Sequence, residues 1–471
     1  MNGRRVTPPS ELTLMRIAVV YWNCDLEGGV ATYLNGVIPA LAQRKHELGF
    51  WHEVAHNGDK DGIALPTGTP VWCAESAGLQ KAIDGLKAWR PDLLFLHGLL
   101  QPQTESELLT IAPSVFFAHE YRGTCISGAK TFKFPVIRPC QRRFGSPCLF
   151  LFYPRRCGGL NPLTMWRDYQ KQQQRLGFLR RCAAIVTHSH HMREEYLRHG
   201  FPPDKVICLP HFVAPPANAN RVSSPLASNP PSVIRLLSST PPSAFRLPPS
   251  VIRLLFLGRM DYLKGGHYLL KALPRIQQVL NRPIDVTFAG DGPARAKWEE
   301  QAKGNAERGM RNAECKEPTV SENHFSSPGT HSNSLRAPPS AFRNSPLSIT
   351  FTGWLGPEQR DELFKSMDLL VVPSLWPEPF GQVGVEAGHH GIPAAAYDVG
   401  GISEWLKEGV NGHLASGNPP TPEGLGDAVI KCLADSDHYA HLRSGALQMT
   451  RLFDLQSHVA ALEEVFRKVV L

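Results

Sequence analysis

The sequence predicts two α/β domains, each a doubly wound parallel sheet covered by helices on both faces. The chain has 471 residues, which is too long for one ordinary hydrophobic core. Short apolar runs of strand length alternate with helical patterns in both halves, as repeated βαβ units require. The strand runs are apolar almost throughout, which is typical of parallel strands buried on both faces.

The first half is expected to form one Rossmann-like domain over residues 15–215. Residues 1–14 lack the apolar stretch of a secretory signal and are predicted to be a flexible tail. A polar helix is expected at 165–181, after an irregular region at 121–163. The remaining elements are a helix at 30–43 and strands at 16–21, 93–97, 114–119, 183–187 and 206–210.

The second half repeats this pattern over residues 251–435. Helices at 436–471 are predicted to pack back toward the first domain. Ligands of open parallel sheets bind beyond the carboxyl ends of the strands, so we expect the functional site in a cleft between the domains. The predicted strands are 254–257, 285–289, 348–352, 369–372 and 393–397.

Two Pro/Ser-rich segments, 216–250 and 303–346, interrupt these patterns and are predicted to be disordered insertions. They share short repeats: PPSVIRLL occurs at 230–237 and 248–255, and PPSAFR at 241–246 and 338–343. We interpret them as translated repetitive DNA in surface loops, with a natural Pro-rich linker as the alternative.

Charge and composition exclude several classes of function. The net charge is +8, but five of these charges lie in the insertions: three cations without an acid in 217–250, and six cations against four acids in 303–346. A nucleic-acid partner is therefore not expected. No apolar run is long enough to span a bilayer. The chain has ten cysteines and no recognisable export signal. This combination favours reduced thiols and a cytoplasmic location.

Two carboxylates and two cations form the candidate site of the second domain. Glu378 precedes a helix expected to begin near Gly381, and Glu386 lies more than one turn inside it. The first N–H groups of such a helix attract an anion such as a diphosphate. Glu378 could then accept hydrogen bonds from sugar hydroxyls and Glu386 from ribose hydroxyls. Arg259 and Lys264 follow the strand at 254–257 and could neutralise the diphosphate, although surface ion pairs are the plain alternative.

The first domain contributes a glycine turn and a histidine. Gly28 and Gly29 follow the first strand and let the backbone approach a ligand closely. His119 ends a later strand, and His97 is a second candidate that could equally be structural. The three histidines near a further helix start, His188, His190 and His191, are interpreted as capping and surface residues.

The second-domain motifs together resemble glycosyltransferase family 4. They comprise Glu378-x7-Glu386 with the intervening Phe380-Gly381, then Gly400-Gly401-Ile-Ser-Glu404, and upstream Arg259-x4-Lys264-Gly. This resemblance implies a GT-B fold, in which an N-terminal acceptor domain and a C-terminal nucleotide-sugar domain face a cleft. It implies catalytic roles for His119, Arg259, Lys264 and Glu378, and substrate binding by Gly28, Gly29, Phe380, Gly381 and Glu386.

The resemblance also implies a reaction. A sugar would move from a UDP- or GDP-linked donor to an acceptor glycan, lipid or small molecule, with retention of configuration, without a cofactor and without an obligatory metal. This is a hexosyltransferase-type activity of class EC 2.4, as in polysaccharide biosynthesis. A GT-B epimerase or hydrolase, or a non-catalytic nucleotide-sugar-binding protein, is the alternative. Pro210-His211-Phe212 departs from the Asn-Gly pair of many relatives, which leaves the interdomain edge open.

The irregular region carries two further features. The gaps between its cysteines are long and include no C-x2-C pair, so packing with reduced thiols is favoured over a metal site. The apolar stretch 148–153, with Phe150 and Phe152, precedes Arg155 and Arg156 and predicts a peripheral membrane contact, at the inner face for a cytoplasmic protein. The cysteines are Cys125, Cys140, Cys148 and Cys157.

Overall fold

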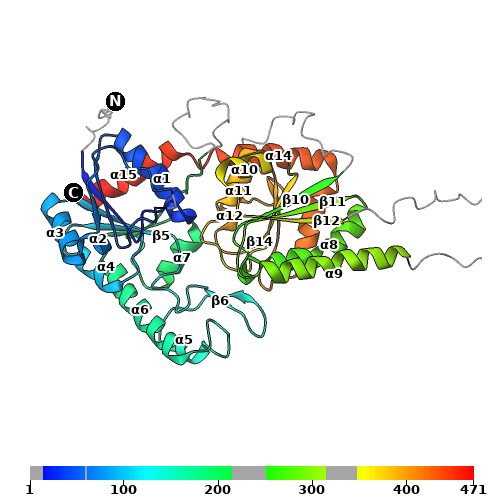
Figure 1. Cartoon of the computed structure of the whole chain (residues 1–471), viewed down its shortest axis with the longest axis horizontal. Coiled ribbons are helices and arrows are strands. Elements are labelled where there is room, and N and C mark those ends of the chain that lie inside the picture. The colour runs from blue at the N-terminus through cyan, green and yellow to red at the C-terminus, as the bar shows by residue number, and fades with distance from the viewer. Residues whose placement is uncertain (1–13, 59–60, 215–250, 315–346) are drawn as a thin grey trace, which may run out of the picture.

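The computed structural model describes residues 14–58, 61–214, 251–314 and 347–471. Two α/β lobes lie side by side, and an arm extends below the first lobe (Figure 1). The predicted tail before Leu14, the insertion at 216–250 and residues 315–346 of the second insertion lie outside the described residues.

The first lobe is built on a seven-stranded sheet in the order β3-β2-β1-β4-β5-β8-β9. Every neighbouring pair in it is parallel. The last five residues of the central strand β1 are buried, because helices cover both faces. The strands are β1 (Arg16–Tyr21), β2 (Glu47–His52), β3 (Val71–Cys73), β4 (Leu93–Leu96), β5 (Ser114–Ala118), β8 (Ala184–Thr187) and β9 (Val206–Cys208).

Alternate side chains of β1 enter two different cores, as the two-residue period of a strand requires. Ile17 and Val19 pack on one face with residues of α1 and α15. Ala18 and Val20 pack on the other face with residues of α3. The helices of this lobe are α1 (Gly28–Gln43), α2 (Ala74–Ala77), α3 (Leu79–Trp89), α4 (Pro102–Leu108) and α7 (His190–Arg198), with α15 (Leu455–Val470) arriving from the end of the chain.

The arm corresponds to the region predicted to be irregular. It contains a small antiparallel pair, β6 (Thr131–Phe132) and β7 (Arg138–Pro139). Two helices follow, α5 (Pro147–Leu151) and α6 (Pro162–Arg181). Asn161 caps α6 by accepting hydrogen bonds from the N–H groups of Leu163 and Thr164.

The second lobe is built on a six-stranded sheet in the order β12-β11-β10-β13-β14-β15, again parallel throughout. Its strands are β10 (Ile252–Leu257), β11 (Ile284–Ala289), β12 (Leu347–Gly353), β13 (Leu369–Val372), β14 (Ala394–Asp398) and β15 (Gly412–Ser416). Its helices are α8 (Gly266–Leu280), α9 (Arg295–Glu314), α10 (Pro357–Lys365), α11 (Val383–His389), α12 (Ile402–Trp405), α13 (Pro422–Leu433) and α14 (Ser436–Thr450), with a short 3₁₀ turn at Tyr262–Lys264.

The last two helices separate, which corrects the prediction that both return to the first domain. Helix α14 contacts α11 and α13 of the second lobe. Helix α15 crosses to the first lobe and contacts α1 (Figure 1). Its side chains Val459 and Leu462 are fully buried there. The burial of the α14 side chains Tyr439 and Leu442 in the second core accounts for this difference.

Other boundaries also differ from the prediction. Helix α9 continues to Glu314, past the predicted insertion boundary at 303. Helix α11 begins at Val383 rather than near Gly381, so Glu386 lies in its first turn. Gly381 has φ +88°, which a right-handed helix cannot contain. Among the described residues, no helix has both the length and the apolar composition that a membrane crossing needs.

Candidate active site

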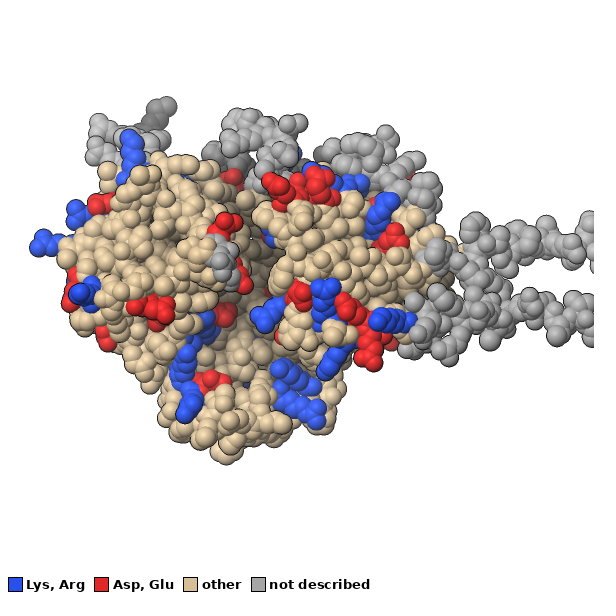
Figure 2. Space-filling view, in the orientation of Figure 1, with Lys and Arg blue, Asp and Glu red and all other residues tan. Residues whose placement is uncertain are grey.

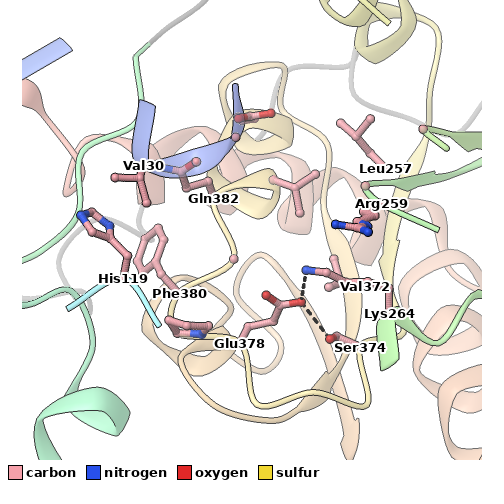
Figure 3. A pocket seen from close by; sticks show the side chains of 18 of the residues that line it. Val30, His119, Leu257, Arg259, Lys264, Val372, Ser374, Glu378, Phe380 and Gln382 are labelled. Carbon is pink, nitrogen blue, oxygen red and sulfur yellow. Dashed lines mark hydrogen bonds and ion pairs between the residues drawn. The ribbon is translucent and has the colours of Figure 1, made fainter. Parts of the chain in front are cut away.

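A cleft of about 750 Å³ opens between the two lobes, within the size range of small-molecule sites. It is lined at the carboxyl ends of strands from both sheets, where parallel α/β folds bind ligands. All nine predicted site residues line it: Gly28, Gly29, His119, Arg259, Lys264, Glu378, Phe380, Gly381 and Glu386. Figure 3 shows Arg259 and Lys264 on one side of the cleft and His119 on the opposite side, with Glu378 between them.

Glu378 and Lys264 form a partly buried ion pair. Lys264 Nζ lies 2.6 Å from Glu378 Oε1, and the Ser374 hydroxyl donates a 2.8 Å hydrogen bond to the same oxygen (Figure 3). The ammonium group also lies 5.2 Å from the centre of the Trp376 ring. The side chain of Glu378 is 8 % exposed and that of Lys264 is 31 % exposed. The carboxylate is therefore held in one orientation while the cation stays accessible from the cleft.

A second layer of backbone contacts fixes the loop that carries Glu378. Gly401 N–H donates a 2.6 Å hydrogen bond to the Glu378 carbonyl. Gly400 has φ +63°, and a Cβ there would lie 2.2 Å from the same carbonyl oxygen. A side chain at either glycine would therefore displace the loop. The Gly400-Gly401 pair thus acts as a support for the Glu378 loop.

Glu386 lies beside Arg360 on the cleft wall. Arg360 Nη1 is 3.8 Å from Glu386 Oε2. Burial raises the pKa of Glu386, and the Arg360 charge opposes this rise. Helix α11 has only seven residues, so its amides are a weak feature of the site. The cations and carboxylates of the cleft wall are better evidence than these amides for a site that binds a charged ligand.

The two lobes touch at the glycine turn. A Cβ on Gly29 would lie 3.5 Å from the Gln382 side-chain oxygen, in ordinary contact. Gln382 Nε2 donates a 2.9 Å hydrogen bond to His211 Nε2, while His211 Nδ1 donates to the Phe212 carbonyl. The His211 ring stacks on Phe380 with centroids 5.1 Å apart. The His211 position, at which the sequence departs from many relatives, therefore belongs to the interdomain contact.

His119 belongs to a buried group of aromatic rings. His119 Nε2 is 2.9 Å from His97 Nδ1, and the His119 ring stacks on Phe117. Burial holds the pKa of His119 well below its usual value, and the neighbouring histidines lower it further. Burial alone lowers the pKa of His97 to about 3. Both rings are therefore neutral near pH 7 and can serve as hydrogen-bonding groups rather than as cations.

One histidine prediction was wrong. His188 was expected at the surface but is 5 % exposed and lines the cleft. His191 Nε2 lies 2.8 Å from the Tyr121 hydroxyl, which donates a 2.6 Å hydrogen bond to the Pro377 carbonyl. His188 directly follows β8 and His191 lies in the first turn of α7, so their sequence spacing did not reveal that both reach the domain boundary.

Several residues that line the cleft were not predicted from the sequence. Ser374 and Trp376 lie in the Glu378 loop, so their position beside a recognised motif was the available signal. Trp354 reaches the cleft from the segment between β12 and α10, and Arg360 reaches it from α10. Trp354 is 67 % exposed although it lines the cleft. Neither residue belongs to a recognisable motif, because it is the order of strands in the sheet that brings each one to the cleft.

Two Rossmann-like domains facing a cleft define the GT-B class of glycosyltransferase folds, and comparisons with solved structures agree. A complex of Anabaena HepE with UDP-glucose superposes with a TM-score of 0.55 at 16 % identity, covering 96 % of this chain and 100 % of that one. WaaG, a glycosyltransferase involved in lipopolysaccharide biosynthesis, gives a TM-score of 0.57 at 15 % identity, with 96 % and 99 % covered. The predicted GT-B fold is thereby confirmed.

Sequence comparisons give the family. The model described as Glycosyltransferase Family 4 matches residues 27–217, and that described as Glycosyl transferases group 1 matches residues 342–449. The chain belongs to glycosyltransferase family 4, as its motifs predict.

Two curated relatives match over part of their length. An uncharacterized glycosyltransferase of Methanocaldococcus jannaschii is 28 % identical over 39 % of this chain and 36 % of its own length. D-inositol 3-phosphate glycosyltransferase of Corynebacterium urealyticum is 26 % identical over 48 % of this chain and 45 % of its own. The chain thus spans less than half the length of these relatives.

Proposed function

We propose that this protein transfers a sugar from a nucleoside diphosphate to an acceptor, with retention of configuration. The observation that carries the proposal is that two cations and two carboxylates of the second domain line one cleft: Arg259, Lys264, Glu378 and Glu386. Such a set can hold an activated sugar at its diphosphate and at its hydroxyl groups. UDP is the first nucleotide to test, because the HepE neighbour is named as a complex with UDP-glucose.

The chemistry follows from where charge develops. Breaking the bond between the sugar and the diphosphate leaves negative charge on the diphosphate, which Arg259 and Lys264 are placed to stabilise. Glu378 orients the sugar by accepting hydrogen bonds from its hydroxyls. The acceptor hydroxyl then forms its bond from the face that the diphosphate leaves, and its proton passes to the departing phosphate oxygen. This geometry retains the configuration of the sugar.

Each end of the donor has a proposed position. The exposed ring of Trp354 offers an aromatic surface for the base, and Glu386 accepts hydrogen bonds from the ribose. On the other wall, Gly28, Gly29 and neutral His119 face the sugar and the acceptor. The acceptor is a glycan, a lipid-linked sugar or a small molecule with a free hydroxyl.

The test is a screen of UDP- and GDP-hexoses against the full chain. Donor binding is measured as a rise in Tm, and turnover as nucleotide diphosphate released with and without a panel of acceptors. Release that requires an acceptor supports transfer, and NMR of the product gives its anomeric configuration. Product without any acceptor supports the epimerase or hydrolase alternative. Donor binding without turnover across the panel supports a binding protein. The Glu378→Gln protein is the control.

We also propose that the arm contacts an anionic membrane from the cytoplasmic side. Residues 121–167 contain no acid and nine cations, of which Lys130 is buried beside Glu195 and Arg122 lines the cleft. The other seven are Lys133, Arg138, Arg142, Arg143, Arg155, Arg156 and Arg167. Exposed apolar side chains accompany them, including Phe150 at 80 % and Leu160 at 86 % exposure. Figure 2 shows basic side chains gathered over the arm. Phe152 is 3 % exposed, so the prediction that it joins this surface was wrong.

A further inference from the structure

The arm has only a small apolar core of its own. Between Arg122 and Asn161 its regular structure consists of two strands of two residues and one helix of five. Three buried side chains form its own core: Ile126, Phe144 and Phe152. Segments of this size usually need a covalent or metal cross-link, and the repulsion among the arm's cations adds to that need.

Four cysteines lie in this arm, and contacts link them in two pairs. Lys130 joins two of them, because its N–H donates to Cys125 Sγ at 3.4 Å while its carbonyl accepts from the Cys140 N–H at 2.7 Å. Cys148 and Cys157 both pack against the three-residue core. The four cysteines therefore belong to one small region of the fold, although their spacing in the sequence gave no such signal.

We propose that Cys125, Cys140, Cys148 and Cys157 bind one zinc ion that holds the arm in its folded form. Four cysteine thiolates are a common ligand set of structural zinc sites. The bound cluster would carry a net charge of −2, in a segment whose other charges are all positive.

The four sulfur atoms still have to close around the ion. Among the described residues, three ligand atoms lie within 4.8 Å of one another only at Cys24, Asp25 and His56. In that group the Asp25 carboxylate already accepts hydrogen bonds from the His56 ring and the Asn57 N–H, which gives it a structural role. Cys125, Cys140 and Cys157 lie in loops and Cys148 lies in α5, and metal sites commonly form together with the fold that they stabilise.

The base of the arm contacts the Glu378 loop, so a zinc ion bound in the arm would also affect the cleft. Tyr121, at the base of the arm, donates to the Pro377 carbonyl next to Glu378. Arg122 lines the cleft and donates a 2.8 Å hydrogen bond to the Leu99 carbonyl. A zinc-stabilised arm would keep both residues in place.

The experiment measures zinc in the full chain. Reduced protein is incubated with zinc sulfate, dialysed and analysed by mass spectrometry for metal content. We expect one zinc per chain in the wild type and in Cys208→Ser, whose cysteine lies in β9, and less than a tenth of that in Cys140→Ser/Cys148→Ser. No zinc in the reduced wild type, or equal zinc in the double variant, would overturn the proposal.

A second measurement does not depend on the variants folding. Alkylation of the wild type is mapped residue by residue with and without zinc. Zinc should protect Cys125, Cys140, Cys148 and Cys157 at least tenfold, leave Cys208 unchanged, and lose this effect when a chelator is added. Unchanged alkylation, or disulfides among the four cysteines in protein purified without reductant, would count against a zinc site.

Discussion

Lys264 and Glu378 come from segments more than a hundred residues apart, yet Nζ and Oε1 are 2.6 Å from each other at the centre of the cleft. The carboxylate neutralises the charge of the ammonium group. A diphosphate would bring a second negative group to the same cation. Lys264 can therefore hold the sugar-orienting carboxylate and the leaving group in one arrangement.

Replacing Lys264 with alanine should lower kcat/KM by about 100- to 1,000-fold, the loss expected when one charge-stabilising group is removed from a transition state. Nucleotide release from the donor that binds best measures the effect. Lys297→Ala, which removes an exposed lysine of α9 outside the cleft, is the matched control. Equal rates for Lys264→Ala and the wild type would remove Lys264 from the mechanism.

Alanine at Gly400 should destabilise the protein much more than alanine at Gly409. The φ angle is +63° at Gly400 and +71° at Gly409. Both substitutions therefore carry backbone strain of about 1–2 kcal/mol. Only at Gly400 does the new Cβ meet the Glu378 backbone, whereas nothing lies within 4 Å at Gly409. Urea unfolding of both variants should separate them by at least about 2 kcal/mol. Similar values would show that the Glu378 loop can move away freely.

The buried histidines should make the fold sensitive to mild acid. In the unfolded chain they bind protons near pH 6.5, whereas burial lowers the folded-state pKa of His97 and His188 to about 3 and of His458 to about 4. As the pH falls below 6.5 the unfolded state gains protons first. The free energy of unfolding should then decrease by up to about 1.4 kcal/mol per pH unit for each histidine.

Urea titrations at pH 7.0, 6.0 and 5.5 measure this dependence above the range in which most carboxylates titrate. The slope should be smaller in His97→Phe, provided that this protein remains folded. An unfolding free energy that is constant over this range would contradict the assignment of neutral rings.

The full chain should sediment with vesicles that contain anionic lipid and not with neutral ones. Phe150→Ser/Leu160→Ser should lower the bound fraction several-fold, because it removes two exposed apolar groups. Val279→Ser, at an exposed apolar position of α8, should leave binding unchanged. Binding should weaken in 1 M salt, where the Debye length falls to about 3 Å. Equal sedimentation with anionic and with neutral vesicles would exclude the electrostatic contact.

Much of the fold was predictable because buried parallel strands have a strong sequence signal. The strand at 16–21 was predicted with its observed bounds, since its residues are apolar almost throughout. Strands β2 and β15 were missed: β2 opens with Glu47 and contains a glycine, and β15 has the sequence GHLAS. Such strands gain their stability from pairing with β1 and β14, which local composition does not report.

Site residues that lie in sequence motifs could be predicted. Site residues that reach the cleft only through the arrangement of the sheets could not. Glu378, Glu386, Arg259 and Lys264 were identified because they fall in recognisable blocks. Arg360 and His188 were missed, because only the arrangement of the sheets brings them to the cleft. The four arm cysteines were judged too far apart in sequence, whereas the folded arm packs Cys148 and Cys157 against one small core.

Helix α15 has a consequence for how the protein is made. Phe466 is fully buried against Phe95, with ring centroids 5.1 Å apart, in a core that otherwise comes from the first part of the chain. Domains usually fold in the order in which the ribosome delivers them. Here the domain that is begun first cannot be finished until the residues of α15 have been synthesised. The nascent first domain therefore keeps an apolar groove open while the second domain is translated, and a chaperone that shields this groove should raise the yield of folded protein.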